Sequence, residues 1–198
     1  MASPNGSRYH DRVTTLDALL RARLPAPGDW QPTDLRRAAV LCPVVAHGGE
    51  DCLLLVVRPT DLRQHAGQIA FPGGMRDGDE PPLATALREC REEVGVPAEA
   101  VAVLGELPPR ASSAGIFVHC LVGRVDPVPL VADPREVVRV LHVPLAELRD
   151  EGRWSERPPP GGAGGSQPRL SPHFVWGEEL LWGLTARFVR DLVGVLRG

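Results

Sequence analysis

The sequence predicts a single α/β domain, in which helices pack against a β-sheet as a sandwich and not as a doubly wound sheet. The chain has 198 residues, of which 43% are hydrophobic, so it is long enough to form one well-packed core. Short apolar, β-branched runs alternate irregularly with segments of helical spacing. No internal repeat is visible.

The first elements are defined by breakers and by the spacing of apolar residues. Residues 13–24 have helical spacing, and three prolines and a glycine within residues 25–32 end this helix. Two β-branched runs follow at residues 38–46 and 52–57, separated by the sequence HGGED. Such a glycine-containing connection between two apolar runs predicts a β-hairpin.

A second helix is predicted over residues 82–94. Two prolines suit its first turn, Asp79 offers a carboxylate for capping, and Gly95 suits its carboxyl end. The expected apolar stripe consists of Leu83, Ala86, Leu87, Cys90 and Val94.

The second half of the chain reads as further strands and a closing helix. Strands are predicted at residues 101–107, 116–125, 137–143 and 174–176, and helices at residues 145–149 and 181–196. The segment RPPPGGAGGSQP, residues 157–168, has almost nothing apolar to bury, so we expect a mobile loop there.

The composition excludes several functional classes. A net charge of −3 offers no overall attraction for nucleic acid or for an anionic membrane. No apolar run is long enough to span a bilayer, and the amino terminus lacks the apolar region of a signal peptide, so we expect a cytoplasmic protein. All 22 basic residues are arginine, which excludes a Schiff-base lysine. The spacing of Cys42, Cys52, Cys90 and Cys120 contains no C-x-x-C and favours buried thiols over a zinc site or disulfides.

Three glutamates crowd one face of the second predicted helix. Glu89, Glu92 and Glu93 are spaced i, i+3 and i+4, and Arg88 can reach Glu92 at i+4. Like charges at this spacing repel each other, so the face is either simply solvated or binds a cation. Several carboxylate oxygens projecting together suit Mg²⁺ or Mn²⁺, and the preceding Gly73 and Gly74 allow the backbone to approach a metal or a phosphate closely.

The spacing of these residues resembles the Nudix box, G-x5-E-x7-R-E-U-x-E-E-x-G-U with U apolar. The match runs from Gly74 through Glu80 and Arg88 to Val96 and holds at every fixed position. The resemblance implies an α-β-α sandwich with a mixed β-sheet, and an enzyme that hydrolyses a nucleoside diphosphate linked to another group. It also implies that the box helix presents its three glutamates to solvent at one end of the sheet.

The same resemblance implies roles for individual residues. Divalent cations, Mg²⁺ or Mn²⁺, would be held by Glu89, Glu93 and Glu92, with the backbone of Gly73 as a further ligand, while Arg88 is tied to Glu92. The general base would be one of these glutamates or a carboxylate outside the box, such as Glu136. Glu80 either orients the loop of the box or interacts with the start of the helix dipole.

The residues ahead of the box resemble the signature of coenzyme A pyrophosphatases, L-L-T-x-R-[SA]-x3-R-x3-G-x3-F-P-G-G. Arg58, Arg63, Gly67 and the Phe71 to Gly74 run fall in register, whereas Val56 replaces the usual threonine and Pro59 the usual serine or alanine. The resemblance implies that Arg58, Arg63 and His65 hold the 3′,5′-ADP half of coenzyme A, since arginine binds phosphate bidentately. Gly73 and Gly74 would approach the diphosphate.

Residues after the box complete this resemblance. The WGLTA run beginning at Trp182 is similar to an element of the coenzyme A branch, although we expect Trp182 to anchor the last helix in the core and Phe71 to pack beneath the loop. The expected reaction therefore converts coenzyme A, or a derivative, to 3′,5′-ADP and 4′-phosphopantetheine.

Two alternatives stay open at this point. One is a Nudix enzyme for ADP-ribose, a dinucleoside polyphosphate or an oxidised nucleotide, although the family's proline and tyrosine markers are missing after the box, where Ala111 to Ala114 reads ASSA. The other is a sensor that has kept the fold but lost catalysis, against which the intact box argues. The oligomeric state is also open, with a homodimer as one alternative.

Overall fold

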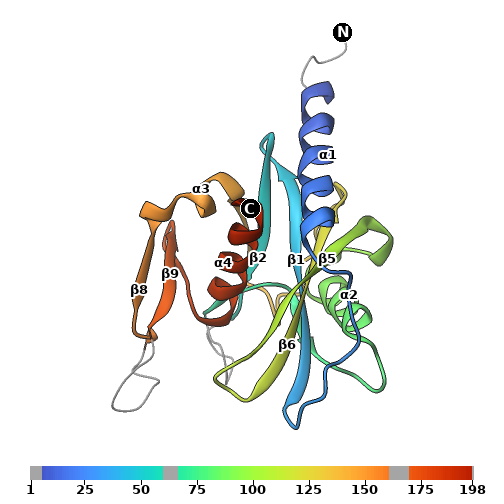
Figure 1. Cartoon of the computed structure of the whole chain (residues 1–198), viewed down its shortest axis with the longest axis vertical. Coiled ribbons are helices and arrows are strands. Elements are labelled where there is room, and N and C mark those ends of the chain that lie inside the picture. Colours follow the sequence, from blue (N-terminus) through green and yellow to red (C-terminus); the bar gives the residue numbers. More distant parts are fainter. Residues whose placement is uncertain (1–5, 60–66, 161–169, 198) are drawn as a thin grey trace.

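The structure is a computed structural model that describes residues 6–59, 67–160 and 170–197. Within this part of the chain, a seven-stranded sheet is flanked by helices on both faces, and a separate three-stranded sheet lies beside it (Figure 1). The helices are α1 (Gly6–Arg23), α2 (Pro82–Val94), α3 (Leu145–Arg149) and α4 (Gly183–Arg197). The larger sheet contains β1 (Arg36–His47), β2 (Glu50–Val57), β3 (Ile69–Ala70), β4 (Gly73–Met75), β5 (Val101–Ala111), β6 (Ile116–Val125) and β7 (Arg139–Pro144), and the smaller one contains β8 (Trp154–Arg157), β9 (Ser171–Trp176) and β10 (Glu179–Leu181).

Strand β1 is the centre of the larger sheet. Along one edge it pairs in parallel with β6, with Ala39 opposite His119. Along its other edge it pairs antiparallel with β4, where Ala39 lies opposite Gly74, and then with β2 in the predicted hairpin. Strand β7 covers the outer edge of β2. Because one pairing is parallel and the others are antiparallel, the sheet is mixed, as the resemblance implied.

The two faces of the sheet bury separate apolar clusters. Side chains alternate between the faces along a strand, so Leu53 and Leu55 face one way, and Leu54 and Val56 the other. The first cluster is closed by α1 and α4, and the second by Ala86, Cys90 and Val94 of α2. Helices therefore cover both faces, and the α-β-α sandwich is confirmed.

Several local predictions are confirmed and others are corrected. Helix α2, strand β6 and helix α3 begin and end where the sequence predicts, and Gly95 ends α2 with a φ of 76° and an N–H bond to the Arg91 carbonyl. The capping role of Asp79 is wrong, because Pro81 is the N-cap and makes no side-chain cap, while Asp79 instead pairs with Arg76.

The carboxyl-terminal predictions are corrected in detail. The closing helix begins at Gly183 and not at residue 181, which belongs to β10, and the strand predicted at residues 174–176 starts three residues earlier, at Ser171. Most of the predicted mobile loop, residues 157–168, lies outside the described residues. Phe71 is buried in the core as expected, but Trp182 is partly exposed and stacks on His173.

The cysteines and the apolar character of the helices agree with the composition of the chain. All four cysteines are free and buried, and burial raises the pKa of Cys52 to about 11 and of Cys90 to about 12. Across the described ranges, none of the helices combines the length and the apolar character needed to cross a bilayer.

Candidate active site

Three carboxylates from two separate segments meet beside the carboxyl-terminal half of α2. Among the described residues, Glu89, Glu93 and Glu136 each offer an oxygen, and these oxygens all lie within 4.8 Å of one another. Hard oxygen donors at this spacing are the ligands that Mg²⁺ and Mn²⁺ prefer. We call Glu89, Glu93 and Glu136 the carboxylate cluster.

The cluster is assembled by α2 and by the connection that runs from β6 to β7. The i, i+4 spacing places Glu89 and Glu93 on one helix face. The connection then docks on the last turn of this helix, where the N–H of Asp133 donates to the Glu93 carbonyl at 2.9 Å. A turn follows, in which the N–H of Glu136 donates to the Asp133 carbonyl at 3.0 Å. The helix end therefore serves as the platform that brings Glu136 to its partners.

Glu93 is the most enclosed member of the cluster. Its side chain is 1% exposed, and its carboxylate accepts hydrogen bonds from the N–H of Gly73 at 3.1 Å and from Nη1 of Arg58 at 3.3 Å. Burial raises the pKa of Glu93 to about 7, and Glu136 and Glu89 add to this effect, whereas Arg58 and the Gly73 N–H oppose it. A divalent cation beside Glu93 would compensate the buried negative charge.

The two glycines of the FPGG run leave space that this arrangement requires. A Cβ atom at Gly74 would lie 2.4 Å from Cδ of Glu89, and one at Gly73 would lie 2.5 Å from the carbonyl oxygen of Ala39. Strand β4 can therefore pass between α2 and β1 only if both positions lack a side chain. The close approach seen at Gly73 and Gly74 is to the protein's own carboxylate and backbone, and the approach to a metal or a phosphate stays a prediction.

Arg88 ties the remaining acidic residues of the box together. Its guanidinium donates to Glu80 at 2.8 Å, to Glu89 at 2.8 Å and to Glu92 at 3.0 Å, and it also reaches the Met75 carbonyl at 3.1 Å. Burial raises the pKa of Glu89, and Arg88 opposes that effect. Arg88 therefore fixes the side chain of Glu89 and links it to the strand that holds Gly74.

Glu80 orients Arg88 from the loop that precedes α2. Its carboxylate accepts from both Arg88 and the hydroxyl of Thr85, and the bond from Arg88 is the largest cause of its lowered pKa. The carbonyl of Glu80 accepts a hydrogen bond from the indole N–H of Trp30 at 2.6 Å. Of the two roles weighed for Glu80, these contacts support the orientation of the box loop.

The structure brings together some of the predicted site residues and separates others. Glu89, Glu93, Arg58 and Gly73 meet as described above, whereas Glu92 is 57% exposed, bonds to Arg88 and lies outside the carboxylate cluster. The expectation that all three glutamates face solvent is wrong, because Glu93 is buried beneath β4. Arg63 and His65 lie outside the described residues.

The sequence predicts some residues of the site only in part or not at all. For Glu136 it offers a possible base outside the box but no contact with α2, because Glu136 is far along the chain and no sequence pattern links it to that helix. Trp30 and Thr85 were not identified. The signal for Thr85 was its place one turn before Glu89 on the same helix.

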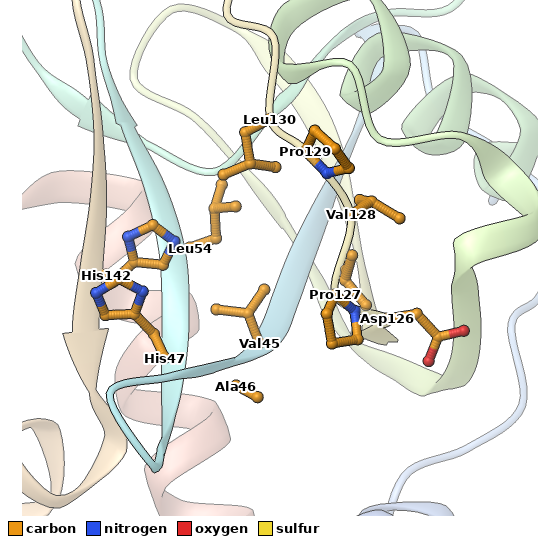
Figure 2. Close-up of a pocket in the computed structure, with 11 residues that line it drawn as sticks. Val45, Ala46, His47, Leu54, Asp126, Pro127, Val128, Pro129, Leu130 and His142 are labelled. Carbon is orange, nitrogen blue, oxygen red and sulfur yellow. The ribbon is translucent and has the colours of Figure 1, made fainter.

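A separate concavity lies on the α2 face of the sheet, beside the last residues of β1 and the middle of β2. It has a volume of about 550 Å³, and Figure 2 shows Pro127, Val128 and Leu130 on one side and the imidazoles of His47 and His142 on the other. The two imidazoles stack with centroids 4.0 Å apart, and burial lowers the pKa of His142. The same β6–β7 connection lines this concavity and carries Glu136, but the carboxylate cluster lies outside it.

Comparison with known proteins places this chain in a family. The NUDIX domain family matches residues 35–160. The chain is similar to an uncharacterized Nudix hydrolase NudL of Photorhabdus laumondii subsp. laumondii, with 40% identity over 178 residues that cover 86% of this chain and 90% of the relative. A relative described in the same words, from Cronobacter sakazakii, is 43% identical over 163 residues, which cover 79% of this chain and 81% of the relative.

Solved structures support the fold. A MutT/nudix family protein from Enterococcus faecalis superposes with a TM-score of 0.57 at 16% sequence identity, over 100% of this chain and 76% of that protein. At this identity the likeness shows the fold alone. The family match and the close relatives show more: the chain belongs to the Nudix hydrolases, enzymes that use divalent metal ions to hydrolyse the pyrophosphate of nucleoside diphosphate derivatives.

Proposed function

We propose that this enzyme hydrolyses the diphosphate of coenzyme A, or of a coenzyme A derivative, to 3′,5′-ADP and 4′-phosphopantetheine. The observation that carries the proposal is the position of Arg58, the first arginine of the coenzyme A signature. Its guanidinium lies 3.3 Å from Glu93, at the edge of the carboxylate cluster. A signature residue that could have been any surface arginine therefore stands beside the place where a diphosphate would bind.

The proposed metal site consists of two members of the carboxylate cluster. Glu89 and Glu93 would hold Mg²⁺ or Mn²⁺, because both are enclosed, both lie on one helix face, and burial raises the pKa of each carboxyl. A bound cation would supply charge neutralisation at the diphosphate oxygens and would make a water molecule more acidic. Glu92 is not included in this set, since its carboxylate is exposed and lies outside the carboxylate cluster.

The neighbouring side chains have separate roles in the proposed reaction. Glu136, which is partly exposed and belongs to a different segment, would take one proton from the attacking water. The water oxygen forms a new bond to phosphorus as the bridging P–O bond breaks and the second phosphate leaves. Arg58 would bind the diphosphate, and Arg88 would keep Glu89 in position.

The adenosine half of the substrate is assigned from the signature. Arg63 and His65 are the proposed contacts to the 3′-phosphate, and the glycines 73 and 74 would lie against the diphosphate. This division moves Arg58 from the 3′,5′-ADP half, where the sequence placed it, to the diphosphate, because its partner Glu93 is a proposed metal ligand.

The test is a substrate panel. The protein is incubated with Mg²⁺ or Mn²⁺ and separately with coenzyme A, ADP-ribose, diadenosine tetraphosphate and 8-oxo-dGTP. Coenzyme A should be cut fastest and should yield 3′,5′-ADP, and a Glu93→Gln preparation should be nearly inactive, which excludes a contaminating enzyme. Faster hydrolysis of ADP-ribose would refute the coenzyme A assignment but not the hydrolase activity.

A further inference from the structure

Arg37, on β1, carries a buried hydrogen-bond donor without a partner. Its Nε atom is buried and unbonded, and its guanidinium forms no ion pair with any residue that the structure describes. Arg124 differs in that its charge is paired with Asp17 at 2.9 Å and with Asp51 at 2.7 Å, although its Nη2 atom is also buried without a hydrogen-bond partner. Buried donors of native proteins almost always have a partner, so the unpaired guanidinium of Arg37 is available to an anion.

The strand register places Arg37 close to the carboxylate cluster. Arg37 is two residues before Ala39 on the same strand, roughly 7 Å away, and their side chains point to the same face of the sheet. Ala39 lies opposite Gly74, against which Glu89 packs. An anion bound at Arg37 is therefore within the span of a nucleotide whose diphosphate lies at the cluster.

Aromatic side chains stand next to Arg37 on this face. Phe117 is its partner across the β1–β6 pairing and is partly exposed. The Phe117 ring meets the buried imidazole of His119 edge-on, with centroids 5.7 Å apart, and Nδ1 of His119 lies 2.5 Å from a carboxylate oxygen of Glu106. The Phe117 ring therefore packs against His119 and remains partly exposed.

The second cation of this region is already neutralised. Arg76 lies 5.8 Å from the centroid of the Trp30 ring and pairs with Asp79 at 3.3 Å. Trp30 is also engaged, since its ring meets His119 edge-on and its N–H bonds to the Glu80 carbonyl. Among the residues described in this region, Arg37 is therefore the cation with unused donors, and Phe117 is the aromatic ring beside it.

This pair of groups matches one class of ligand. The planar guanidinium of arginine binds phosphate through paired hydrogen bonds, and an aromatic ring offers a stacking surface to a nucleobase. We infer that Arg37 and Phe117 form part of the subsite for the phosphorylated purine nucleoside half of the substrate, with the base against Phe117 and with Arg37 as one of the donors to the 3′-phosphate. The inference rests on the proposed function for the identity of that nucleotide, 3′,5′-ADP. Neither residue belongs to the Nudix box or to the coenzyme A signature.

The chain contains a matched control for the test. Arg36 is adjacent to Arg37, is exposed and points to the opposite face of β1, so Arg36→Gln removes the same charge without touching the subsite. Binding of 3′,5′-ADP and of AMP is measured by titration calorimetry without divalent cations, for the wild type, Arg37→Gln and Arg36→Gln. Arg37→Gln should weaken 3′,5′-ADP binding on the order of tenfold or more, and Arg36→Gln about twofold or less.

The outcomes separate this inference from the proposed function. If the wild type binds the nucleotides and the two arginine variants bind them equally, or if the wild type binds neither nucleotide, the subsite is refuted. If Arg37→Gln weakens binding but the wild type does not cut coenzyme A, the subsite stands and the substrate assignment fails.

Two further variants test the subsite even if Arg37→Gln does not fold. Arg37→Lys keeps the charge but lacks the planar fork, and it should also weaken 3′,5′-ADP binding. Phe117→Leu should weaken binding of 3′,5′-ADP several-fold and leave binding of inorganic phosphate unchanged. Full 3′,5′-ADP affinity in both variants would overturn the assignment.

Discussion

The guanidinium of Arg58 lies 3.3 Å from the carboxylate of Glu93, and it joins the end of β2 to the last turn of α2. The side chain of Arg58 is 24% exposed, whereas that of Glu93 is 1% exposed, so the guanidinium is the part of this pair that solvent can reach. A partly exposed arginine that compensates a buried carboxylate is well placed to contact a phosphate once a metal ion neutralises that carboxylate. The pair therefore connects the proposed metal site with the proposed diphosphate site.

Replacing Glu93 should remove activity without unfolding the protein. Glu93→Gln keeps the shape of the side chain but removes a proposed ligand charge, so kcat should fall by on the order of 10² or more. The melting temperature should stay the same or rise, because a buried charge and its repulsion with Glu89 are removed.

Glu92→Gln is the neighbouring control for this change. Glu92 lies outside the carboxylate cluster and bonds to Arg88, so kcat should fall by much less in Glu92→Gln than in Glu93→Gln. Equal losses in the two variants, or full turnover by Glu93→Gln, would contradict the assignment of Glu93 as a metal ligand.

The metal-free protein should lose stability as the pH rises through neutrality. The pKa of Glu93 in the folded state, about 7, lies above its ordinary value of 4.5, so folding favours the protonated form. The stabilising contribution is fully present below the unfolded pKa and is lost as the pH rises through about 7. The melting temperature should therefore fall between about pH 5 and about pH 8, and less so for Glu93→Gln.

Added Mg²⁺ should reverse this loss in the wild type, because binding to the folded state alone is stabilising. Melting temperatures are measured across this pH range for the wild type and for Glu93→Gln, with and without Mg²⁺. The difference between the two proteins gives the contribution of Glu93 apart from that of other titrating groups. Identical pH dependence in the two proteins would show that Glu93 does not titrate as described.

Glu136→Gln should separate proton transfer from metal binding. If Glu136 accepts the proton of the attacking water, kcat should fall by on the order of 10² while the affinity for Mn²⁺ changes little. Glu89→Gln should lower both kcat and the affinity for Mn²⁺, since Glu89 is a proposed ligand. Titration of Mn²⁺ monitored by electron paramagnetic resonance, together with kcat, makes the distinction. A large loss of Mn²⁺ affinity in Glu136→Gln would make Glu136 a ligand instead.

Arg63→Ala should distinguish coenzyme A from dephospho-coenzyme A. The second compound lacks the 3′-phosphate, so it cannot form a charge-assisted hydrogen bond that is typically worth about 1.5 to 3 kcal/mol. The variant should lower kcat/KM for coenzyme A far more than for dephospho-coenzyme A. Equal losses on the two substrates would move Arg63 to the diphosphate.

The order of the elements and the identity of the box could be read from the sequence because their signals are local. Prolines at the start of α2, the apolar spacing within it and Gly95 at its end determine backbone angles over a few residues, and the helix follows these limits. The same periodicity placed Glu89 and Glu93 on one face. Asp79 shows where such signals fail: a capping residue was available, but the chain enters the helix through Pro81 and Asp79 pairs with Arg76.

The composition of the site depended on contacts between distant segments. Glu136 joins Glu93 because the β6–β7 connection bonds to the last turn of α2, and no local pattern in the sequence specifies that docking. Glu93 is buried, and its pKa raised, because β4 passes over it with two glycines, whereas Glu92, one residue away, stays exposed on Arg88. The sequence alone thus determined the helix, its acidic face and the family, while strand pairing and loop docking decided which carboxylates meet, because burial and proximity arise only when separate segments pack together.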